Sequence, residues 1–219
     1  MIPGGFAAGD YVRAGAIFAA RLRSRLADEL REFVKSRKPI FGVCNGFQVL
    51  VEAGLLPALD APMTEVPEAV LATNDSGHYE CRPSLLRLDN RGSCVFTQTL
   101  KAGNVVTFIS AHAEGKLLFP KAREKRILKE LVDNDQVVFR FVDDKGHAGK
   151  YPWNPSGTTD GIAALCNRDG NVFGVQPHPE RCFFRELRPD WTRRDGIDTL
   201  YGDGKELFES VLSYVSRTF

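Results

Sequence analysis

Cys44 is the residue whose sequence context most strongly suggests chemistry. A short apolar run, Ile40 to Val43, leads into it, and an Asn-Gly pair follows it. This pattern predicts a buried strand that turns sharply into a helix, with the cysteine at the turn and near the helix N-terminus. We expect the positive end of the helix dipole to favour the thiolate there. The alternative is a buried, inert cysteine, which is a common role of a free thiol.

A histidine and a carboxylate that could serve this thiol lie far downstream, in Pro177-His178-Pro179-Glu180. Residues before proline are held extended, and residues two apart in an extended chain point the same way. His178 and Glu180 therefore share a face, where the carboxylate can orient the imidazole. We interpret Cys44, His178 and Glu180 as a triad for acyl transfer through a thioester. Alone, the His-Pro-Glu segment would more simply be a rigid surface turn.

The tetrahedral intermediate of acyl transfer needs hydrogen-bond donors for its oxyanion. The backbone N–H of Asn45, at the start of the expected helix, is one candidate. The turn Pro3-Gly4-Gly5-Phe6 is another, because glycines let the backbone approach a ligand closely. We expect the N–H groups of Gly5, Phe6 and Asn45 to form this site. The turn is not a phosphate loop, since no Lys-Ser or Lys-Thr follows it.

Composition indicates an ordinary globular chain that can bury a substantial core. The 219 residues are 43% hydrophobic and 26% charged, with no linker or low-complexity tract, so we expect a single domain over 1–219. The balance of 29 basic and 28 acidic residues argues against a general attraction to nucleic acid or membranes. No apolar stretch approaches the roughly 18–20 residues of a membrane span, and the start lacks a signal-peptide pattern. Five scattered cysteines without a Cys-x-x-Cys pair argue against disulfides and zinc, so we expect no metal and a cytoplasmic location.

The spacing of apolar residues predicts the elements that must position these groups. Helices are expected over 10–36, 45–53, 121–133 and 204–217. Strands are expected at 40–43, 70–73, 85–88, 94–97, 105–110, 137–142, 162–165 and 172–175. The last two strands predict a β-hairpin, and the short middle strands indicate an antiparallel insertion in a parallel α/β core.

Two of these motifs are specific enough to name a family. Gly42 to Gln48 resembles the nucleophile elbow of class I (triad-type) glutamine amidotransferases, and Pro177 to Arg181 resembles their histidine–glutamate motif. Within this class the chain is most similar to the glutaminase subunits of phosphoribosylformylglycinamidine synthase. Further matching segments run in the expected order along the chain: 3–6, 9–11, 13–16, 74–77, 81–82, 111–115 and 154–157.

The resemblance implies a doubly wound, flavodoxin-like fold with a mainly parallel sheet and antiparallel additions. It implies that Cys44 attacks the side-chain amide of glutamine, that His178 moves protons, and that Glu180 orients His178. Ammonia would pass to a separate synthetase subunit, which converts formylglycinamide ribonucleotide to formylglycinamidine ribonucleotide in purine biosynthesis. ATP and magnesium would belong to that partner, and this chain would carry no cofactor. In some members a small third subunit bridges the complex.

The resemblance also implies roles beyond the triad. Gln48 matches a position associated with glutamine binding, although it could be structural. His112, Glu114 and Arg82 match segments at the rim of the site or facing the partner, where the alternative is a solvated loop.

Family members normally begin with a strand, a helix and a strand before the Pro-Gly-Gly turn, and we expect these elements to be absent here. The oxyanion assignment to Gly5 and Phe6 then depends on whether other residues steady this turn. Two alternatives stay open: a glutaminase serving another acceptor, and a catalytically impaired partner-binding module.

Overall fold

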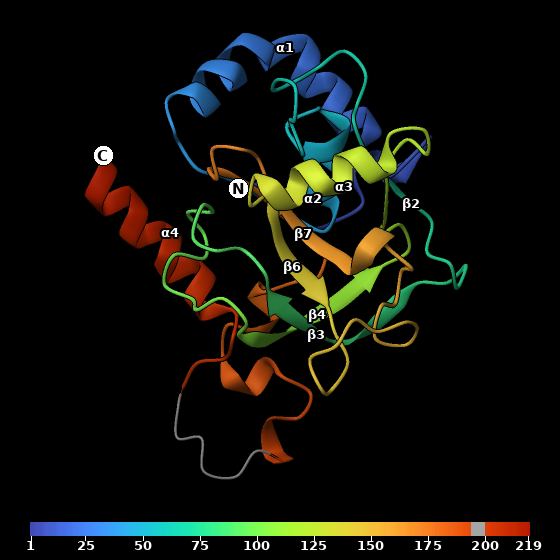
Figure 1. The fold of residues 1–219 in the computed structure, drawn as a ribbon, viewed down its shortest axis with the longest axis vertical. Helices are drawn as coiled ribbons and strands as arrows, with labels where there is room; N and C mark the ends of the chain where they lie inside the picture. The colour runs from blue at the N-terminus through green and yellow to red at the C-terminus, as the bar shows by residue number, and fades with distance from the viewer. Residues whose placement is uncertain (194–199) are drawn as a thin grey trace.

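The computed structural model describes residues 1–193 and 200–219, which form helices packed around a twisted sheet (Figure 1). The helices are α1 (Ala16–Lys35), α2 (Asn45–Glu52), α3 (Glu124–Asp133) and α4 (Lys205–Thr218). The strands are β1 (Ile40–Val43), β2 (Val70–Ala72), β3 (Glu80–Leu88), β4 (Val105–His112), β5 (Lys116–Leu118), β6 (Val137–Phe141), β7 (Ile162–Cys166) and β8 (Val172–Val175). These elements confirm most of the predicted helices and strands, with shifts at their ends.

The main sheet has six strands in the order β1-β8-β7-β6-β3-β4, while β2 and β5 form a separate antiparallel pair. Only β1 and β8 run parallel among the named strands of the described residues. The expected mainly parallel sheet is therefore wrong, although the α/β class and the predicted β7–β8 hairpin are confirmed. Parallel neighbours need a long crossover connection, and strands joined by a short turn such as 167–171 must run antiparallel.

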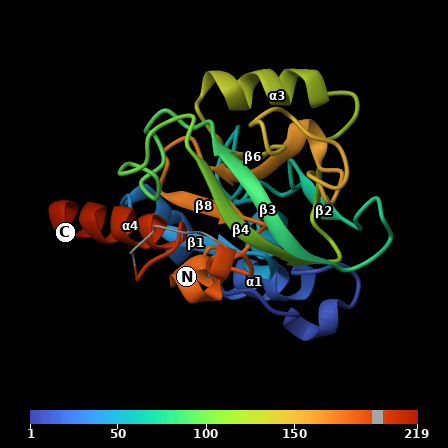
Figure 2. The ribbon, with the colours of Figure 1, turned by 90° about the horizontal axis from the view of Figure 1, so that it is seen from below.

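Two apolar clusters lie on opposite faces of this sheet. Side chains of α1, α2 and α3 pack with alternate residues of the strands on one face, and Leu207 of α4 packs with the other set. Figure 1 shows α1, α2 and α3 together at the top of the molecule and α4 apart from them. In the view from below, β3 and β4 lie side by side across the molecule (Figure 2). The turn at Cys44, between β1 and α2, therefore lies where the two apolar clusters meet.

Residues 94–97 were expected to form a strand, and that prediction is wrong. They form a turn in which Val95 and Phe96 are buried, with the Phe96 ring 5.3 Å from Phe41 and 5.2 Å from Phe173. Their apolar character comes from packing beneath α4 rather than from sheet pairing. A buried apolar run cannot be told from a strand by its pattern alone.

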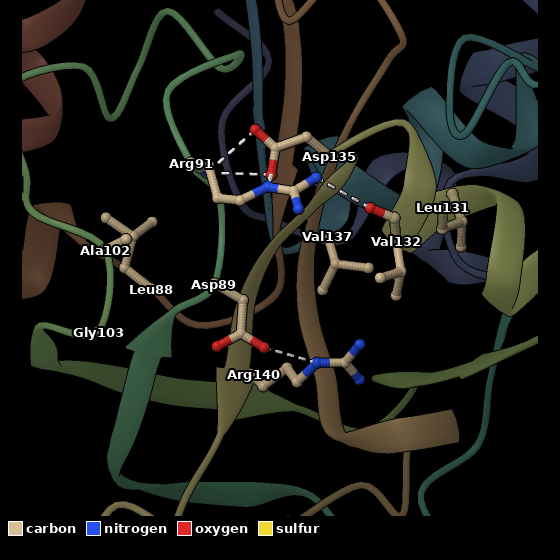
Figure 3. A pocket seen from close by; sticks show the side chains of 10 residues that line it. All are labelled: Leu88, Asp89, Arg91, Ala102, Gly103, Leu131, Val132, Asp135, Val137 and Arg140. Carbon is tan, nitrogen blue, oxygen red and sulfur yellow. Dashed lines mark hydrogen bonds and ion pairs between the residues drawn. The ribbon is translucent and has the colours of Figure 1, made fainter.

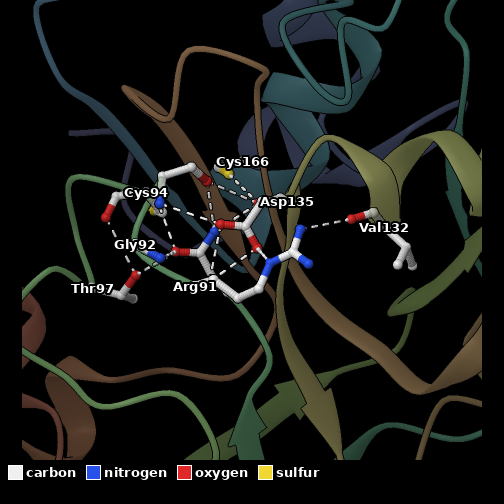
Figure 4. Close-up of polar contacts among 9 residues, drawn as sticks. Arg91, Gly92, Cys94, Thr97, Val132, Asp135 and Cys166 are labelled. Atoms are coloured by element: carbon white, nitrogen blue, oxygen red, sulfur yellow. Dashed lines mark hydrogen bonds and ion pairs between the residues drawn. The ribbon is translucent and has the colours of Figure 1, made fainter.

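The turn that follows α3 holds this segment in place (Figure 4). The Asp135 carboxylate accepts the backbone N–H of Arg91 at 2.9 and 3.0 Å and that of Ser93 at 3.3 Å. Its backbone carbonyl accepts the Asn90 side-chain amide at 2.6 Å. Asp135 therefore fixes the residues that lead into 94–97. The backbone N–H groups of 94–97 find other partners, since that of Cys94 donates to Oδ1 of Asn90 at 3.2 Å and that of Val95 to the Gly170 carbonyl at 3.0 Å.

Two facing glycines bring α2 against the sheet. Gly42 of β1 lies opposite Gly174 of β8, and a Cβ at Gly42 would come within 2.6 Å of the Gly46 carbonyl oxygen. A Cβ at Gly174 would collide with the ring of Phe47. Because neither strand carries a side chain there, the helix that follows Cys44 packs directly on the strand backbones.

Candidate active site

Cys44 occupies the sharp turn between β1 and α2 that its sequence context predicts. Its backbone has φ 50° and ψ −107°, a conformation that non-glycine residues adopt only when the surroundings enforce it. The Cys44 N–H donates to the Val175 carbonyl at 2.9 Å, and the Cys44 carbonyl accepts from the Gln48 N–H at 3.1 Å. The end of β8 and the first turn of α2 therefore hold the nucleophile in its strained geometry.

The thiol of Cys44 is enclosed, with 7% of the residue exposed. It donates to the Ala111 carbonyl at 3.5 Å, and the side-chain amide of Gln176 lies 3.9 Å from the sulfur. Burial raises the pKa of Cys44 to about 11, while a hydrogen bond from the Asn45 backbone acts in the opposite direction. The start of the helix acts in the expected direction, since the Asn45 N–H lowers the pKa of Cys44, but the larger effect of burial leaves that pKa raised.

His178 and Glu180 are in contact, as predicted, but the extended chain expected between them is wrong, because Pro179 has φ −69° and ψ −31° and the backbone turns there. His178 is 4% exposed, and its backbone N–H donates to the Ile109 carbonyl of β4 at 2.8 Å. Its Nδ1 is hydrogen-bonded to Oε1 of Glu180, which begins a short 3₁₀ turn, Glu180–Cys182. A Cβ added at Gly4 would lie 2.6 Å from Cε1 of His178 and 3.5 Å from Cβ of Cys44. Gly4 thus touches both the imidazole and the nucleophile, which places them in one site.

The Pro3–Phe6 turn is held beside β1. The Ile2 N–H donates to the Phe41 carbonyl at 2.7 Å, and the Ile2 carbonyl accepts the Val43 N–H at 3.1 Å. Gly5 and Phe6 line a small hollow of about 40 Å³ together with Cys44. These hydrogen bonds fix the start of the turn against β1, while the oxyanion role of Gly5 and Phe6 stays a prediction.

Gln48 and Glu114 lie at the same hollow and are joined by a hydrogen bond. The Gln48 side-chain amide donates to the Glu114 carbonyl at 2.7 Å and accepts from the Asn45 side chain at 2.9 Å. The Glu114 carboxylate accepts the Ala14 N–H at 3.0 Å. Asp10 lines the hollow as well, and desolvation followed by the charge of Glu114 raises its pKa. Glu114 therefore lines the hollow that contains Cys44, and its role at the rim of a glutamine site stays a prediction.

His112, at the end of β4, is not the solvated loop residue that the alternative reading allowed. It is 2% exposed, its Nδ1 lies 3.2 Å from Oδ1 of Asn74, and burial lowers its pKa to about 4. The Asn74 side-chain amide donates to two carbonyls, so its oxygen must face His112, which fixes the neutral Nδ1–H tautomer. Arg82 is a surface residue whose guanidinium binds Glu80 at 2.8 Å and the Tyr151 hydroxyl at 3.0 Å. Arg82 does not line the hollow.

Three site residues were not assigned a role from the sequence: Gly4, Asp10 and Gln176. The sequence offered one signal for Gln176, because it stands two residues before His178 in the segment that follows β8. The acceptor for the thiol, the Ala111 carbonyl, carries no side-chain signal at all.

A larger hollow of about 290 Å³ lies between the end of β3 and α3 (Figure 3). Its charged groups pair with one another, Asp89 with Arg140 at 2.8 Å and Arg91 with Asp135 at 3.3 Å. It therefore offers a ligand little uncompensated charge. Within 1–193 and 200–219, no group of three or more His, Cys, Asp or Glu side chains is arranged to hold a metal ion. None of the helices described there is long and apolar enough to cross a membrane.

Comparison with known proteins identifies the family of this chain. The sequence profile of the CobB/CobQ-like glutamine amidotransferase domain matches residues 1–215. The chain is 51% identical over 219 residues to the phosphoribosylformylglycinamidine synthase subunit PurQ of Archaeoglobus fulgidus, covering 99% of this chain and 78% of that protein. The chain belongs to the PurQ family. The family predicted from the elbow and histidine motifs is thereby confirmed.

Other PurQ-family comparisons agree. PurQ of Picrophilus torridus is 44% identical over 186 residues, covering 84% of this chain and 68% of that protein. Among solved structures, a chain of PurLQS from Thermotoga maritima superposes with a TM-score of 0.69 at 30% identity, covering 97% of this chain and 77% of that one. PurQ membership extends over nearly the whole chain, including the Pro3–Phe6 turn and the His178 segment.

Proposed function

We propose that this chain is the glutaminase subunit of a phosphoribosylformylglycinamidine synthase and acts in purine biosynthesis. It hydrolyses glutamine to glutamate and ammonia, and a synthetase subunit uses the ammonia to make formylglycinamidine ribonucleotide. The observation that carries the proposal is a strained Cys44 turn beside a buried His178–Glu180 pair in a chain of the PurQ family.

In this proposal His178 takes the Cys44 proton as the sulfur attacks the side-chain amide carbon of glutamine. The resulting oxyanion accepts hydrogen bonds from the backbone N–H groups of Asn45, Gly5 and Phe6. The C–N bond then breaks, the imidazolium gives its proton to the departing nitrogen, and ammonia leaves a glutamyl thioester. His178 next takes a proton from water, whose oxygen attacks the thioester. Glutamate departs, and the proton returns to the Cys44 sulfur.

Glu180 keeps the His178 ring in the tautomer that presents Nε2 to the nucleophile, since it accepts the Nδ1–H, and it stabilises the imidazolium. Buried charge on His178 would be costly without this partner. The carboxylates of Asp10 and Glu114 give the hollow a negative rim that suits the α-ammonium of glutamine. Gln48 fixes the Glu114 carbonyl at this rim and thereby shapes the glutamine site.

We assign this chain partners of the PurL and PurS type, in keeping with its likeness to a chain of PurLQS from Thermotoga maritima. ATP and magnesium then act in the synthetase subunit, the chain itself needs no cofactor, and the complex works in the cytoplasm. Glu114 and Arg82 would lie at or near the face that meets the synthetase, with the buried His112 behind it.

The test is Cys44→Ala in the complex assembled with its synthetase. Glutamine-dependent synthesis should be lost, while synthesis from added ammonia should continue at the unmodified rate. Cys81→Ala, which removes an exposed thiol, is the matched control and should retain both activities. Labelling by an electrophilic glutamine analogue, read by peptide mass spectrometry, should modify Cys44 and be blocked by glutamine. Persistence of glutamine-dependent synthesis in Cys44→Ala would refute the proposal.

A further inference from the structure

Gln176 lies directly after β8 and next to the nucleophile, yet the mechanism above gives it no task. It is 1% exposed, and its backbone N–H donates to the Ala163 carbonyl of β7 at 3.0 Å. Its side-chain nitrogen, Nε2, lies 3.9 Å from Sγ of Cys44 and 3.5 Å from the Glu114 carbonyl oxygen. The segment that directly follows β8 therefore brings both Gln176 and His178 to the site.

The orientation of the Gln176 amide follows from its neighbours. A carbonyl oxygen only accepts hydrogen bonds, so Nε2 and not Oε1 must face Glu114, and the same end faces the sulfur. Oε1 is consequently turned away, and it is buried with no hydrogen-bond partner in the part of the chain that the structure describes. A buried acceptor without a partner destabilises the fold, whereas methionine of similar length would avoid that cost. Packing alone does not explain an amide here.

Two uncharged donors face the sulfur in the described residues: the backbone N–H of Asn45 and Nε2 of Gln176. Several titratable groups also act on it or lie beside it: Glu180, Asp10, Arg181, Tyr79 and His178. Of the first three, Glu180 and Asp10 disfavour a negative sulfur and Arg181 favours it. When the thiol loses its proton, its hydrogen bond to the Ala111 carbonyl is lost, and the two N–H groups become its partners.

We propose that Gln176 is a positioning residue that donates its side-chain N–H to the Cys44 sulfur and so supports the thiolate that attacks glutamine. The inference rests on the proposed function, in which Cys44 is the nucleophile. The Glu114 carbonyl holds the amide in place from the other side, and the unpartnered Oε1 is the cost of keeping an N–H at the sulfur. Hydrogen bonds to a charged acceptor are stronger than those to a neutral one, so the contact strengthens as the proton leaves.

The experiment replaces Gln176 by methionine and follows alkylation of Cys44 by iodoacetamide against pH, with peptide mass spectrometry to read that one site. We expect the pH midpoint to rise by about one unit, and the rate at any pH below it to fall about tenfold. In the assembled complex, kcat for glutamine hydrolysis should fall while KM changes little. The thermal midpoint should stay equal to that of the unmodified protein or rise, since the unpartnered acceptor is removed.

Gln98→Met, at an exposed glutamine, is the matched control and should leave the alkylation profile unchanged. An unchanged profile in Gln176→Met would overturn the proposal, as would a fall in thermal midpoint with no change in profile. Gln176→Leu provides a second variant of similar size. Failure of both variants to fold would also contradict the proposal, because it would mean that the amide is needed for packing. If the glutamine analogue does not label Cys44 in the unmodified protein, the proposed function fails instead.

Discussion

Replacement of Gly4 by alanine should disable the site while leaving the fold intact. The added Cβ would lie 2.6 Å from Cε1 of His178, whereas carbon atoms normally pack about 3.5–4.0 Å apart. Either the ring or the turn must therefore move by roughly 1 Å. The ring is held by Glu180 and by backbone pairing to Ile109, so the displacement separates the imidazole, the turn and Cys44 from their working geometry.

A misplacement of about 1 Å can cost on the order of 10²-fold in rate, which corresponds to about 2.7 kcal/mol of transition-state stabilisation. We expect kcat for glutamine hydrolysis in the assembled complex to fall by that factor in Gly4→Ala. The free energy of unfolding in urea should change by less than about 1 kcal/mol, because the turn lies at the surface, where its residue Phe6 is exposed.

Gly146→Ala is the matched control. Its added methyl would meet nothing within 4 Å, but its φ of 79° makes alanine unfavourable by about 1 kcal/mol. It should therefore lose some stability and no activity, the reverse of Gly4→Ala. If Gly4→Ala retained activity within about threefold of the unmodified enzyme, the placement of His178 against this turn would be refuted.

Three further predictions concern the triad, a buried histidine and the packing of α2. Glu180→Gln should lower kcat by on the order of 10²–10⁴-fold with little change in KM, because an amide N–H that faces Nδ1 favours the wrong tautomer of His178. Steady-state kinetics measure both constants, and a change in KM without a change in kcat would contradict the prediction. His112 has its pKa lowered from 6.5 to about 4 by burial, so the unfolded chain binds the proton first, and stability should fall as the pH drops from about 6.5 through 4. The free energy of unfolding of His112→Gln, measured by urea titration, should therefore fall less over that pH range, by up to about 3 kcal/mol. Equal falls in the variant and in the unmodified protein would exclude the effect. Gly174→Ala forces a methyl into the Phe47 ring and should destabilise the fold by about 1–3 kcal/mol, whereas an unchanged urea midpoint would show that α2 can move away.

The sequence was most informative where a local rule decided the structure. The Asn-Gly pair after an apolar run predicted the Cys44 turn. The contact between His178 and Glu180 was predicted as well, but from an extended geometry that the chain does not keep at Pro179. Both depend on backbone preferences within a few residues. The β7–β8 hairpin was predictable for the same reason, because its turn residues lie between two short apolar runs.

Long-range relations were not predictable in this way. The direction of strand pairing depends on which segment returns beside which, so an apolar strand such as β6 fits a parallel or an antiparallel neighbour equally well. The raised pKa of Cys44 comes from enclosure by segments far away in the chain, including Ala111 and Gln176. The helix dipole was visible in the sequence, but the desolvation that outweighs it was not.

The parallel pairing of β1 with β8 also has a consequence for synthesis of the protein. Cys44 leaves the ribosome long before Val175, the residue whose carbonyl fixes its backbone, and before His178. At about 5–20 residues per second, this interval is on the order of ten seconds. During that time the nascent chain carries a cysteine with neither its strained turn nor its proton acceptor. A partly synthesised subunit therefore cannot hydrolyse glutamine. Hydrolysis can begin only after β8 has paired with β1 and the His178 segment that follows it has reached Cys44.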